Sequence, residues 1–370
     1  MNSIKHCDTC FFSAVILDVK QQTPPGESIM KEHLDPGHIM QTATAFWASK
    51  VLLTAVELDL FTTLGDGKMT APQLGKTLGL HPRGTYDFFD ALVALKFLNR
   101  NGDGPRGEYE NTLQTAAFLN KKSPNYIGGM PEMLNSRLFG FWNGLGTALR
   151  TGKPQSELKH GGKSIFEDLY SNEVTLGEFL DAMTGFQAEN FTQLARKFDF
   201  SPYKTVSDIG GALALLSRIL ANHHHHLSFN SFDLPPVAPL AQKHIEAAGM
   251  EQRIQAIAGD FLKEELPKAD VITMGNILHD WNLDNKKMLI RKAYNALPDG
   301  GAFIAIENLI DDARRENVFG LLMSLNMLIE FGDAFDYTGA DFREWCSEIG
   351  FKRFEFIHLA GPTSAAIAYK

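Results

Sequence analysis

The stretch Val206-Ser-Asp-Ile-Gly-Gly-Ala-Leu-Ala-Leu-Leu-Ser217 joins a short apolar run to a helical pattern through two adjacent glycines. Such a turn is typical of nucleotide-type cofactor sites, because glycine allows positive φ and lets backbone N–H groups approach a ligand closely. The glycines stop halfway, since alanine stands at positions 212 and 214. The stretch therefore predicts the first strand and the cofactor turn of an α/β domain. The alanines raise the question of whether a cofactor still binds there.

The sequence around this turn alternates short apolar runs with helical patterns from about residue 204 onward. That alternation indicates a doubly wound, mostly parallel, Rossmann-like sheet, so the expected fold class is α/β. Only a short turn separates the last two runs, and we therefore expect an antiparallel hairpin at one edge. The expected strands are residues 204–210, 227–234, 254–260, 269–276, 301–308, 352–361 and 364–370.

The 370 residues divide into four segments by composition and pattern. Residues 1–35 contain the linker-like "QQTPPGES" and are interpreted as an N-terminal extension. Residues 36–120 predict three helices and a Gly-rich β-turn, a winged-helix-like arrangement in which Thr70 caps a helix that starts with proline. Residues 121–200 are expected to be a helical connector that contributes to a substrate pocket. Residues 201–370 are the expected cofactor-binding domain.

A winged helix raises DNA binding as a rival function, and charge argues against it. The helix expected over 82–98 is dominated by apolar side chains, and acids equal bases between residues 66 and 110. The net charge of -9 also opposes binding to nucleic acid. The apolar face of residues 46–61 is larger than one small core needs. We therefore expect this domain to make a homodimer.

The remaining composition excludes further classes of protein. No apolar run approaches the roughly 20 residues that a membrane span needs, so no membrane association is expected. Three cysteines are too few for a disulfide framework, which favours a cytoplasmic protein. Two motifs invite a metal interpretation, Cys7-x-x-Cys10 beside His6 and the run His223–His226. Both are weak signals, and we expect no metal.

Polar residues at the ends of the expected strands indicate a binding site. In open α/β sheets, ligands bind outside the carboxyl ends of the strands. Asp208 at the first turn is suited to a cationic amine, and Asp233 ends the second strand where a carboxylate can accept both ribose hydroxyls. Asp260 ends the third strand, His279 follows the fourth and Glu307 ends the fifth. This is the layout of an enzyme.

These residues together resemble the small-molecule O-methyltransferases that use S-adenosylmethionine, the group that includes plant caffeate-type and animal acetylserotonin methyltransferases. The resemblance covers roughly residues 38–370 and implies a class I methyltransferase fold with a dimerisation domain, S-adenosylmethionine as cofactor and a small-molecule acceptor. It rests on five stretches that stand in family order: "FDLPPV", "AGDF", "LHDW", "ALPDGGAFIAIENLIDD" and "SLNMLIEF".

The resemblance implies a role for individual residues. His279 corresponds to the general base of the family, Glu307 to the acid that orients it and Asp336 to a second supporting acid. Met323 and Met327 are expected to serve the core first and the wall of an acceptor pocket second. Asn326 is either satisfied in the core or directed at a ligand. The implied cofactor site is Asp208, Gly210, Gly211, Asp233, Leu234, Asp260, Phe261 and Asn276, and the implied acceptor site is Met323, Asn326 and Met327.

Two departures from the family pattern bear on these expectations. The family usually has Asp-x-Gly-x-Gly-x-Gly at the first turn, whereas this chain has Ala212 and Ala214 in place of the last two glycines. We expect weakened rather than abolished cofactor binding. The third acid is usually Glu, and Asp336 is one methylene shorter, so its support of the base is expected to be indirect. A hydroxyl is the expected acceptor, and the alternatives are a sulfur or carbon acceptor and a non-methylating pseudoenzyme.

Overall fold

A computed structural model of the chain describes residues 34–161 and 173–370. Residues 34–45 belong to a compact unit separate from residues 46–370. Helix α1, Gly37–Glu57, begins in the first unit, where the hydroxyls of Thr42 and Thr44 donate to backbone carbonyls one turn earlier. The expectations for Cys7, Cys10 and most of the 1–35 extension lie outside the described residues.

The segment that follows α1 has the winged-helix arrangement predicted from the sequence. In the described chain it holds a three-stranded sheet of order β1-β3-β2, and Phe89, Leu92 and Tyr109 lie in its core. Thr70 is the N-cap of α3, as expected, and it also forms a capping box with Gln73. The elements are α2 (Leu60–Leu64), β1 (Met69–Thr70), α3 (Ala71–Thr77), α4 (Pro82–Ala94), β2 (Leu98–Asn101), η1 (Gly104–Arg106), β3 (Glu108–Asn111) and α5 (Leu113–Phe118).

The expected helix over 82–98 is shorter in the structure. Helix α4 ends at Ala94, and Lys96 takes a φ of 67°, in the left-handed region that terminates helices. Leu98 then begins strand β2. The apolar run misled the prediction because it continues without a break from the helix into a buried strand residue.

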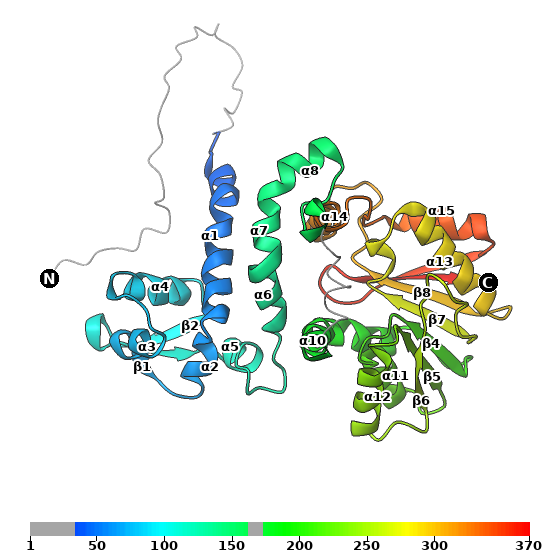
Figure 1. Ribbon diagram of the computed structural model, residues 1–370, viewed down its shortest axis with the longest axis horizontal. Helices are drawn as coiled ribbons and strands as arrows, with labels where there is room; N and C mark the ends of the chain where they lie inside the picture. The colour runs from blue at the N-terminus through cyan, green and yellow to red at the C-terminus, as the bar shows by residue number, and fades with distance from the viewer. Residues whose placement is uncertain (1–33, 162–172) are drawn as a thin grey trace, which may run out of the picture. The chain divides into compact units, whose positions relative to one another are not determined.

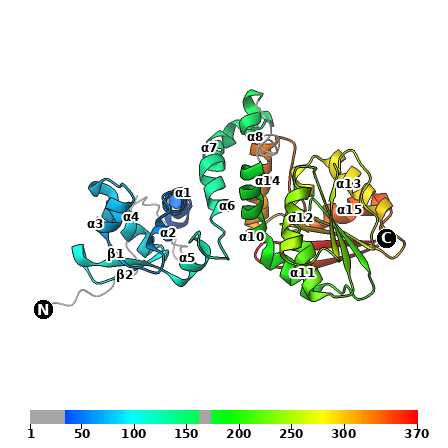
Figure 2. The same cartoon turned by 60° about the horizontal axis from the view of Figure 1, so that its bottom comes forward.

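The middle of the chain is helical. Helix α14 (Val318–Glu330) contacts α8 (Leu145–Thr151), and the two lie side by side (Figures 1 and 2). The elements of this stretch are α6 (Gly129–Met133), the π-turn η2 (Leu134–Leu138), α7 (Phe139–Phe141), η3 (Trp142–Gly144), α8 (Leu145–Thr151), η4 (Glu157–His160) and α10 (Glu173–Lys197).

The described C-terminal half forms a seven-stranded sheet of order β6-β5-β4-β7-β8-β10-β9. The first five of these strands are parallel, whereas β10 pairs antiparallel with both β8 and β9. This confirms the predicted parallel sheet with an antiparallel hairpin at one edge. The strands are β4 (Thr205–Ile209), β5 (Ser228–Asp233), β6 (Ile254–Ala258), β7 (Val271–Gly275), β8 (Ala302–Glu307), β9 (Arg353–His358) and β10 (Ser364–Tyr369).

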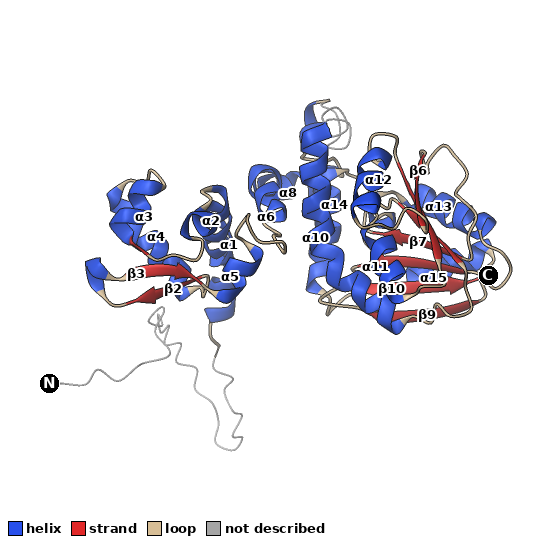
Figure 3. Cartoon of the chain, turned by 90° about the horizontal axis from the view of Figure 1, so that it is seen from below, coloured by secondary structure: helices blue, strands red, loops and turns tan. Residues whose placement is uncertain are grey.

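Helices cover both faces of this sheet (Figure 3). Successive residues of β8 enter opposite cores: Ala302, Ile304 and Ile306 face α10, α11 and α12, while Phe303 and Ala305 face α13 and α15. This alternation follows from the two-residue period of a strand. The remaining elements are α11 (Leu215–His223), α12 (Ala238–Ala247), η5 (Leu278–Asp280), α13 (Leu283–Ala296), α14 (Val318–Glu330) and α15 (Gly339–Ile349).

The strand order reverses between β4 and β7, and the carboxyl ends of both strands meet at one edge of the sheet. That is where a doubly wound sheet holds its ligand. Among the described helices, none is long and apolar enough to cross a membrane.

Candidate active site

His279 is delivered by a sharp turn after strand β7. Asn276 takes a φ of 52°, a left-handed conformation that asparagine tolerates, and its N–H donates to the carbonyl of Ile306 at 3.0 Å. The chain then forms the short turn η5, which contains His279. The turn therefore brings the imidazole over the end of the neighbouring strand β8.

Glu307 ends β8 and holds this turn in place. By strand alternation its side chain lies on the same face as Phe303 and Ala305. Its Oε1 accepts the N–H of Leu278 at 3.0 Å and that of His279 at 3.4 Å. Its Oε2 lies 3.8 Å from Nδ1 of His279. The carboxylate of Glu307 thus contacts both the backbone of residues 278–279 and the imidazole ring of His279.

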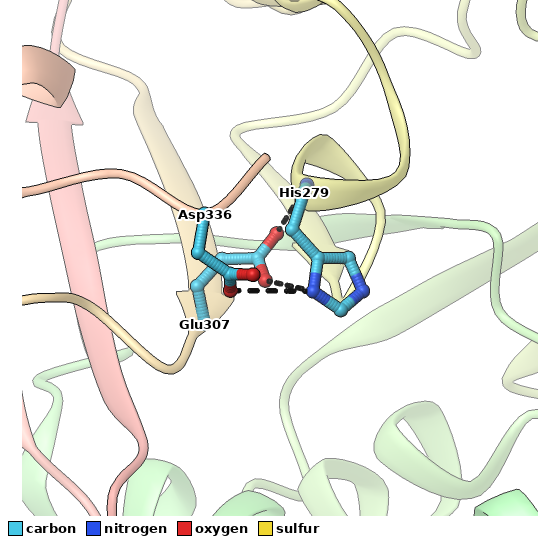
Figure 4. A group of neighbouring side chains, drawn as sticks. All are labelled: His279, Glu307 and Asp336. Atoms are coloured by element: carbon cyan, nitrogen blue, oxygen red, sulfur yellow. Dashed lines mark hydrogen bonds and ion pairs between the residues drawn. The ribbon is translucent and has the colours of Figure 1, made fainter. Parts of the chain in front are cut away.

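Asp336 reaches the same imidazole from the segment between α14 and α15, and it does so directly, so the expectation of indirect support was wrong. Its Oδ1 lies 3.4 Å from Nδ1 of His279, and its own N–H donates to the hydroxyl of Ser324 at 3.2 Å. The side chains of His279, Glu307 and Asp336 are all buried and point toward one another (Figure 4). On the other side of the ring, Nε2 lies 3.3 Å from Oδ1 of Asp280.

The electrostatics of this cluster are those of a strong base. Burial lowers the pKa of His279, but the carboxylates of Glu307, Asp280 and Asp336 outweigh burial and raise it to about 10. Burial raises the pKa of Glu307 to about 7 and that of Asp280 to about 6, although His279 opposes both shifts. The excess of acids around one imidazole therefore favours a proton on His279.

The first turn keeps its left-handed backbone despite the alanines. Gly210, Ala212 and Ala214 have φ values of 70°, 46° and 59°. A left-handed alanine costs roughly 1–2 kcal/mol more than glycine. A Cβ at Gly210 would collide with the side chain of Ile277, and one at Gly211 with the hydroxyl of Ser231. The two glycines are thus required by packing, while the alanines hold the expected turn under strain.

The acids of the first two strands fit a ligand that carries an ammonium group and vicinal hydroxyls. Asp208 is buried and accepts a hydrogen bond from Thr273, a neutral donor, at 2.8 Å, and burial raises its pKa to about 7. Asp233 accepts the N–H of Ala212 at 2.8 Å and that of Leu234 at 2.7 Å, and burial raises its pKa to about 6. An incoming cation or hydroxyl donor would stabilise the ionised form of each acid.

The third expected acid is more exposed. Asp260 forms an ion pair with Lys263 at 2.9 Å, and the hydrogen bond from Lys263 lowers the pKa of Asp260. Its neighbour Phe261 meets Trp281 edge-on, with ring centroids 6.0 Å apart. The roles that the resemblance gives to Asp260, Phe261, Leu234 and Asn276 remain predictions.

Asn326 is satisfied within the protein. Its Oδ1 accepts the indole N–H of Trp142 at 3.0 Å, and its Nδ2 donates to Glu330 at 2.7 Å. Whether Asn326 also reaches an acceptor remains a prediction. Met327 is buried and Met323 is partly buried on the same helix, and contact of either with an acceptor remains a prediction.

The histidine run and the catalytic cluster both bear on metal binding. His224 and His226 direct Nε2 at the backbone carbonyls of Ala195 and Phe200, at 2.9 and 3.2 Å. In the described chain, the one group of three or more suitable ligand atoms within 4.8 Å of one another is His279, Glu307 and Asp336. One imidazole nitrogen and two carboxylate oxygens are a possible ligand set for a divalent cation.

Sequence reasoning missed three residues that shape this site. Trp142 and Glu330 both bind the side chain of Asn326. Trp142 has no local sequence signal because its partner lies 184 residues away, whereas Glu330 stands four residues after Asn326 on α14, a spacing that could have found it. Lys286 lies fully buried beside the acids. Helical spacing could have found it, because Lys286, Ile290 and Ala293 share one face of α13 and the last two are core residues.

Comparison with known proteins places the chain among methyltransferases. The model of the O-methyltransferase domain matches residues 142–352, and that of the O-methyltransferase dimerisation domain matches residues 40–121. The tetracenomycin polyketide synthesis 8-O-methyl transferase TcmO of Streptomyces glaucescens is 36% identical over 90% of this chain and 97% of its own length. The N,N-dimethyltransferase OxyT of Streptomyces rimosus is 34% identical over 85% of this chain and 90% of its own length.

A solved structure shows the same fold. The crystal structure of human N-acetylserotonin methyltransferase in complex with S-adenosylmethionine superposes with a TM-score of 0.82 at 27% identity. The match covers 92% of this chain and 99% of the human chain.

Proposed function

The chain belongs to the O-methyltransferase family, and from this membership we propose that His279 removes the proton from a phenolic hydroxyl as that hydroxyl is methylated. The family activity is S-adenosylmethionine-dependent methyl transfer to a small-molecule hydroxyl. One observation carries the proposal: a buried imidazole has two carboxylates on Nδ1, at 3.4 and 3.8 Å. They favour a proton on Nδ1, and Nε2, which lies 3.3 Å from Oδ1 of Asp280, is the nitrogen that we propose takes the acceptor proton.

The chemistry of the base selects the kind of hydroxyl. Proton transfer is efficient when donor and acceptor have similar pKa values, and a phenol has a pKa of about 10. The acids around His279 raise its pKa, which brings it toward the pKa of a phenol. An aliphatic hydroxyl is far less acidic and is a poor partner for this imidazole. Among the relatives, TcmO acts as an O-methyl transferase in polyketide synthesis, and a polyketide-type phenol is the acceptor class that we assign.

The cofactor supplies an electrophilic methyl group, and the residues of this chain hold it in place. Asp208 is proposed to bind the ammonium group and Asp233 the ribose hydroxyls. Gly210 and Gly211 let the backbone of the turn approach. Holding the reacting groups in line contributes on the order of 7–11 kcal/mol to catalysis, and a general base adds about 10²–10⁴-fold, so His279 assists a reaction that positioning dominates.

The N-terminal domain is proposed to join two copies of the chain. The dimerisation-domain model matches it. Phe46 and Trp47 on α1 are 55% and 62% exposed, and an apolar pair of this size is typical of an interface.

The test offers matched acceptors to the full-length protein. A hydroxynaphthoate and its amino counterpart are incubated separately with labelled S-adenosylmethionine, with and without EDTA. We expect label on the hydroxyl compound, with a rate that EDTA leaves unchanged. Labelling of the amine alone would transfer the assignment to nitrogen chemistry, such as that named for OxyT. A rate abolished by EDTA and restored by Mg²⁺ would make the cluster a metal site instead.

A further inference from the structure

Lys286 is a buried cation that the proposed mechanism does not use. It lies on α13, one turn after the N-cap Asn282, and its relative exposure is 0%. A lysine is almost never fully buried unless it is paired, because loss of hydration destabilises its charge. The surroundings of Lys286 must therefore compensate for that loss.

The contacts of Lys286 join two segments of the active site. Its ammonium donates to the carbonyl of Trp281, two residues after the base. It also lies 3.7 Å from the ring centroid of Phe335 and 6.0 Å from that of Tyr337, the two residues that flank Asp336. The ammonium is thus held between the segment that carries His279 and the segment that carries Asp336.

A second contact from the same helix end joins the same two segments. The side-chain amide of Asn282 donates to Asp333 at 2.9 Å, while its oxygen caps α13 by accepting the N–H of Asn285. Asn282 and Lys286 therefore both contact the segment 333–337.

The charges that face Lys286 are those of the catalytic cluster. Burial lowers its pKa to about 8, while carboxylates from every element packed around it oppose that shift: Glu307 of β8, Asp336 and Asp333 of the loop after α14, and Asp280 of η5. The charge of Glu330, at the end of α14, helps to raise the pKa of Asp280. At neutral pH, Lys286 carries the positive charge that offsets these acids.

We propose that Lys286 is a positioning residue for the base: its ammonium, held between the carbonyl of Trp281 and the ring of Phe335, supplies the positive charge that offsets the surrounding acids and so limits how strongly they hold the imidazole proton. The expected effect of Lys286 on the rate rests on the proposed function, in which His279 is the base. The expected effect of Lys286 on the protonation of His279 does not. Without the cation, the same carboxylates act on the imidazole unopposed. His279 then keeps its proton to higher pH, and fewer molecules hold it as a base.

The test compares four variants of the full-length protein. Lys286→Met removes the charge and keeps an unbranched chain, whereas Lys286→Gln removes the charge and keeps a donor for the Trp281 carbonyl. Lys286→Arg keeps the charge. Lys287→Met is the matched control, because Lys287 is the next residue of the same helix and pairs with Glu348 at 2.6 Å, away from the cluster.

Two measurements follow these variants. The protonation of His279 is titrated by NMR on isotope-labelled histidine without cofactor or acceptor, and its signal is assigned with His279→Gln. Single-turnover rates are then measured across the same pH range. We expect Lys286→Met and Lys286→Gln to raise the midpoint of His279 by about one pH unit, and to lower the rate on the acid limb about tenfold. The midpoints of Lys286→Arg and Lys287→Met should stay within a few tenths of a unit.

The outcomes separate this proposal from the proposed function. An unchanged NMR midpoint in a folded Lys286→Gln protein overturns the role of Lys286, whatever the acceptor is. If Lys286→Met does not fold, the comparison of Lys286→Gln with Lys286→Arg decides alone. A shifted NMR midpoint with a rate that is independent of pH in the wild type supports Lys286 and rejects His279 as the base.

Discussion

At the scale of single residues, the site depends on one imidazole and the acids around it. If His279 removes the acceptor proton, His279→Ala should lower the single-turnover rate by roughly 10²–10⁴-fold. The affinity for S-adenosylhomocysteine should barely change, because His279 is not among the residues proposed to hold the cofactor. Stopped-flow and calorimetric titration test both parts. His223→Ala serves as a control at the exposed end of α11, and an equal loss there would point to instability rather than chemistry.

The pH dependence of the rate follows from the same carboxylates. A base works in its neutral form, and because the acids raise the pKa of His279 to about 10, the rate should increase as pH rises from neutrality toward that value. Glu307→Gln keeps an oxygen for the N–H of Leu278 but removes one negative charge. It should lower the pKa of His279 and move the acid limb down by about one unit. A limb that moves upward contradicts this electrostatic account.

The left-handed alanines make a prediction about stability. Ala212→Gly relieves backbone strain at a partly buried position and should stabilise the protein by about 1 kcal/mol, or about 2 °C in Tm. Ala214 is fully buried, so the loss of its methyl, worth about 0.8 kcal/mol, should cancel most of the gain. Scanning calorimetry of the two variants measures the difference. A lower Tm for Ala212→Gly would show that the turn is not strained there.

At the scale of elements, the carboxyl ends of β4 and β5 hold two buried acids with raised pKa values. Burial raises the pKa of Asp208 to about 7 and that of Asp233 to about 6, so both are partly protonated in mildly acidic buffer. A ligand that brings an ammonium group to Asp208 and hydroxyl donors to Asp233 favours the ionised forms. Binding should therefore release protons below about pH 7 and release fewer above it.

This release can be measured without methyl transfer. Calorimetric titration of S-adenosylhomocysteine in buffers of different ionisation enthalpy gives the number of protons exchanged at each pH. Asp208→Asn should reduce the release in mildly acidic buffer, and Asp260→Asn should not, because the pKa of Asp260 is already low. Proton uptake by the wild type under these conditions would rule out the assigned roles of Asp208 and Asp233.

At the scale of the whole molecule, the proposed homodimer makes a prediction about mass. The chain has a mass of 41.1 kDa, and light scattering at micromolar concentration should report twice that value. Phe46→Glu with Trp47→Glu places charges on the exposed face of α1 and should shift the mass toward one chain. Lys76→Glu, on α3, is a control for added charge. A wild-type particle with the mass of one chain would contradict the proposed homodimer.

The sequence by itself determined the elements and the acids at their ends. Strand and helix patterns are local, because the period of two or 3.6 residues reports which side of an element is buried. For this reason the runs that became β4 to β10 were recognised, and Asp208, Asp233 and Glu307 were expected at the ends of their strands. A turn after β4 was also expected from its two glycines, but of its positive-φ residues only Gly210 is a glycine, and the other two are Ala212 and Ala214. The prediction of element boundaries failed at the end of α4, where apolar residues continue from the end of the helix into the start of strand β2.

Only the tertiary structure decided which side chains meet. Asn326 accepts the indole N–H of Trp142, which lies 184 residues away in the sequence. The acids that reach His279 come from β8 and from the loop before α15, and Lys286 is buried between their segments by the packing of α13. Charges and hydrogen bonds act over a few ångströms in space, whereas sequence patterns report distances along the chain. The protonation of the base is therefore a property of the fold.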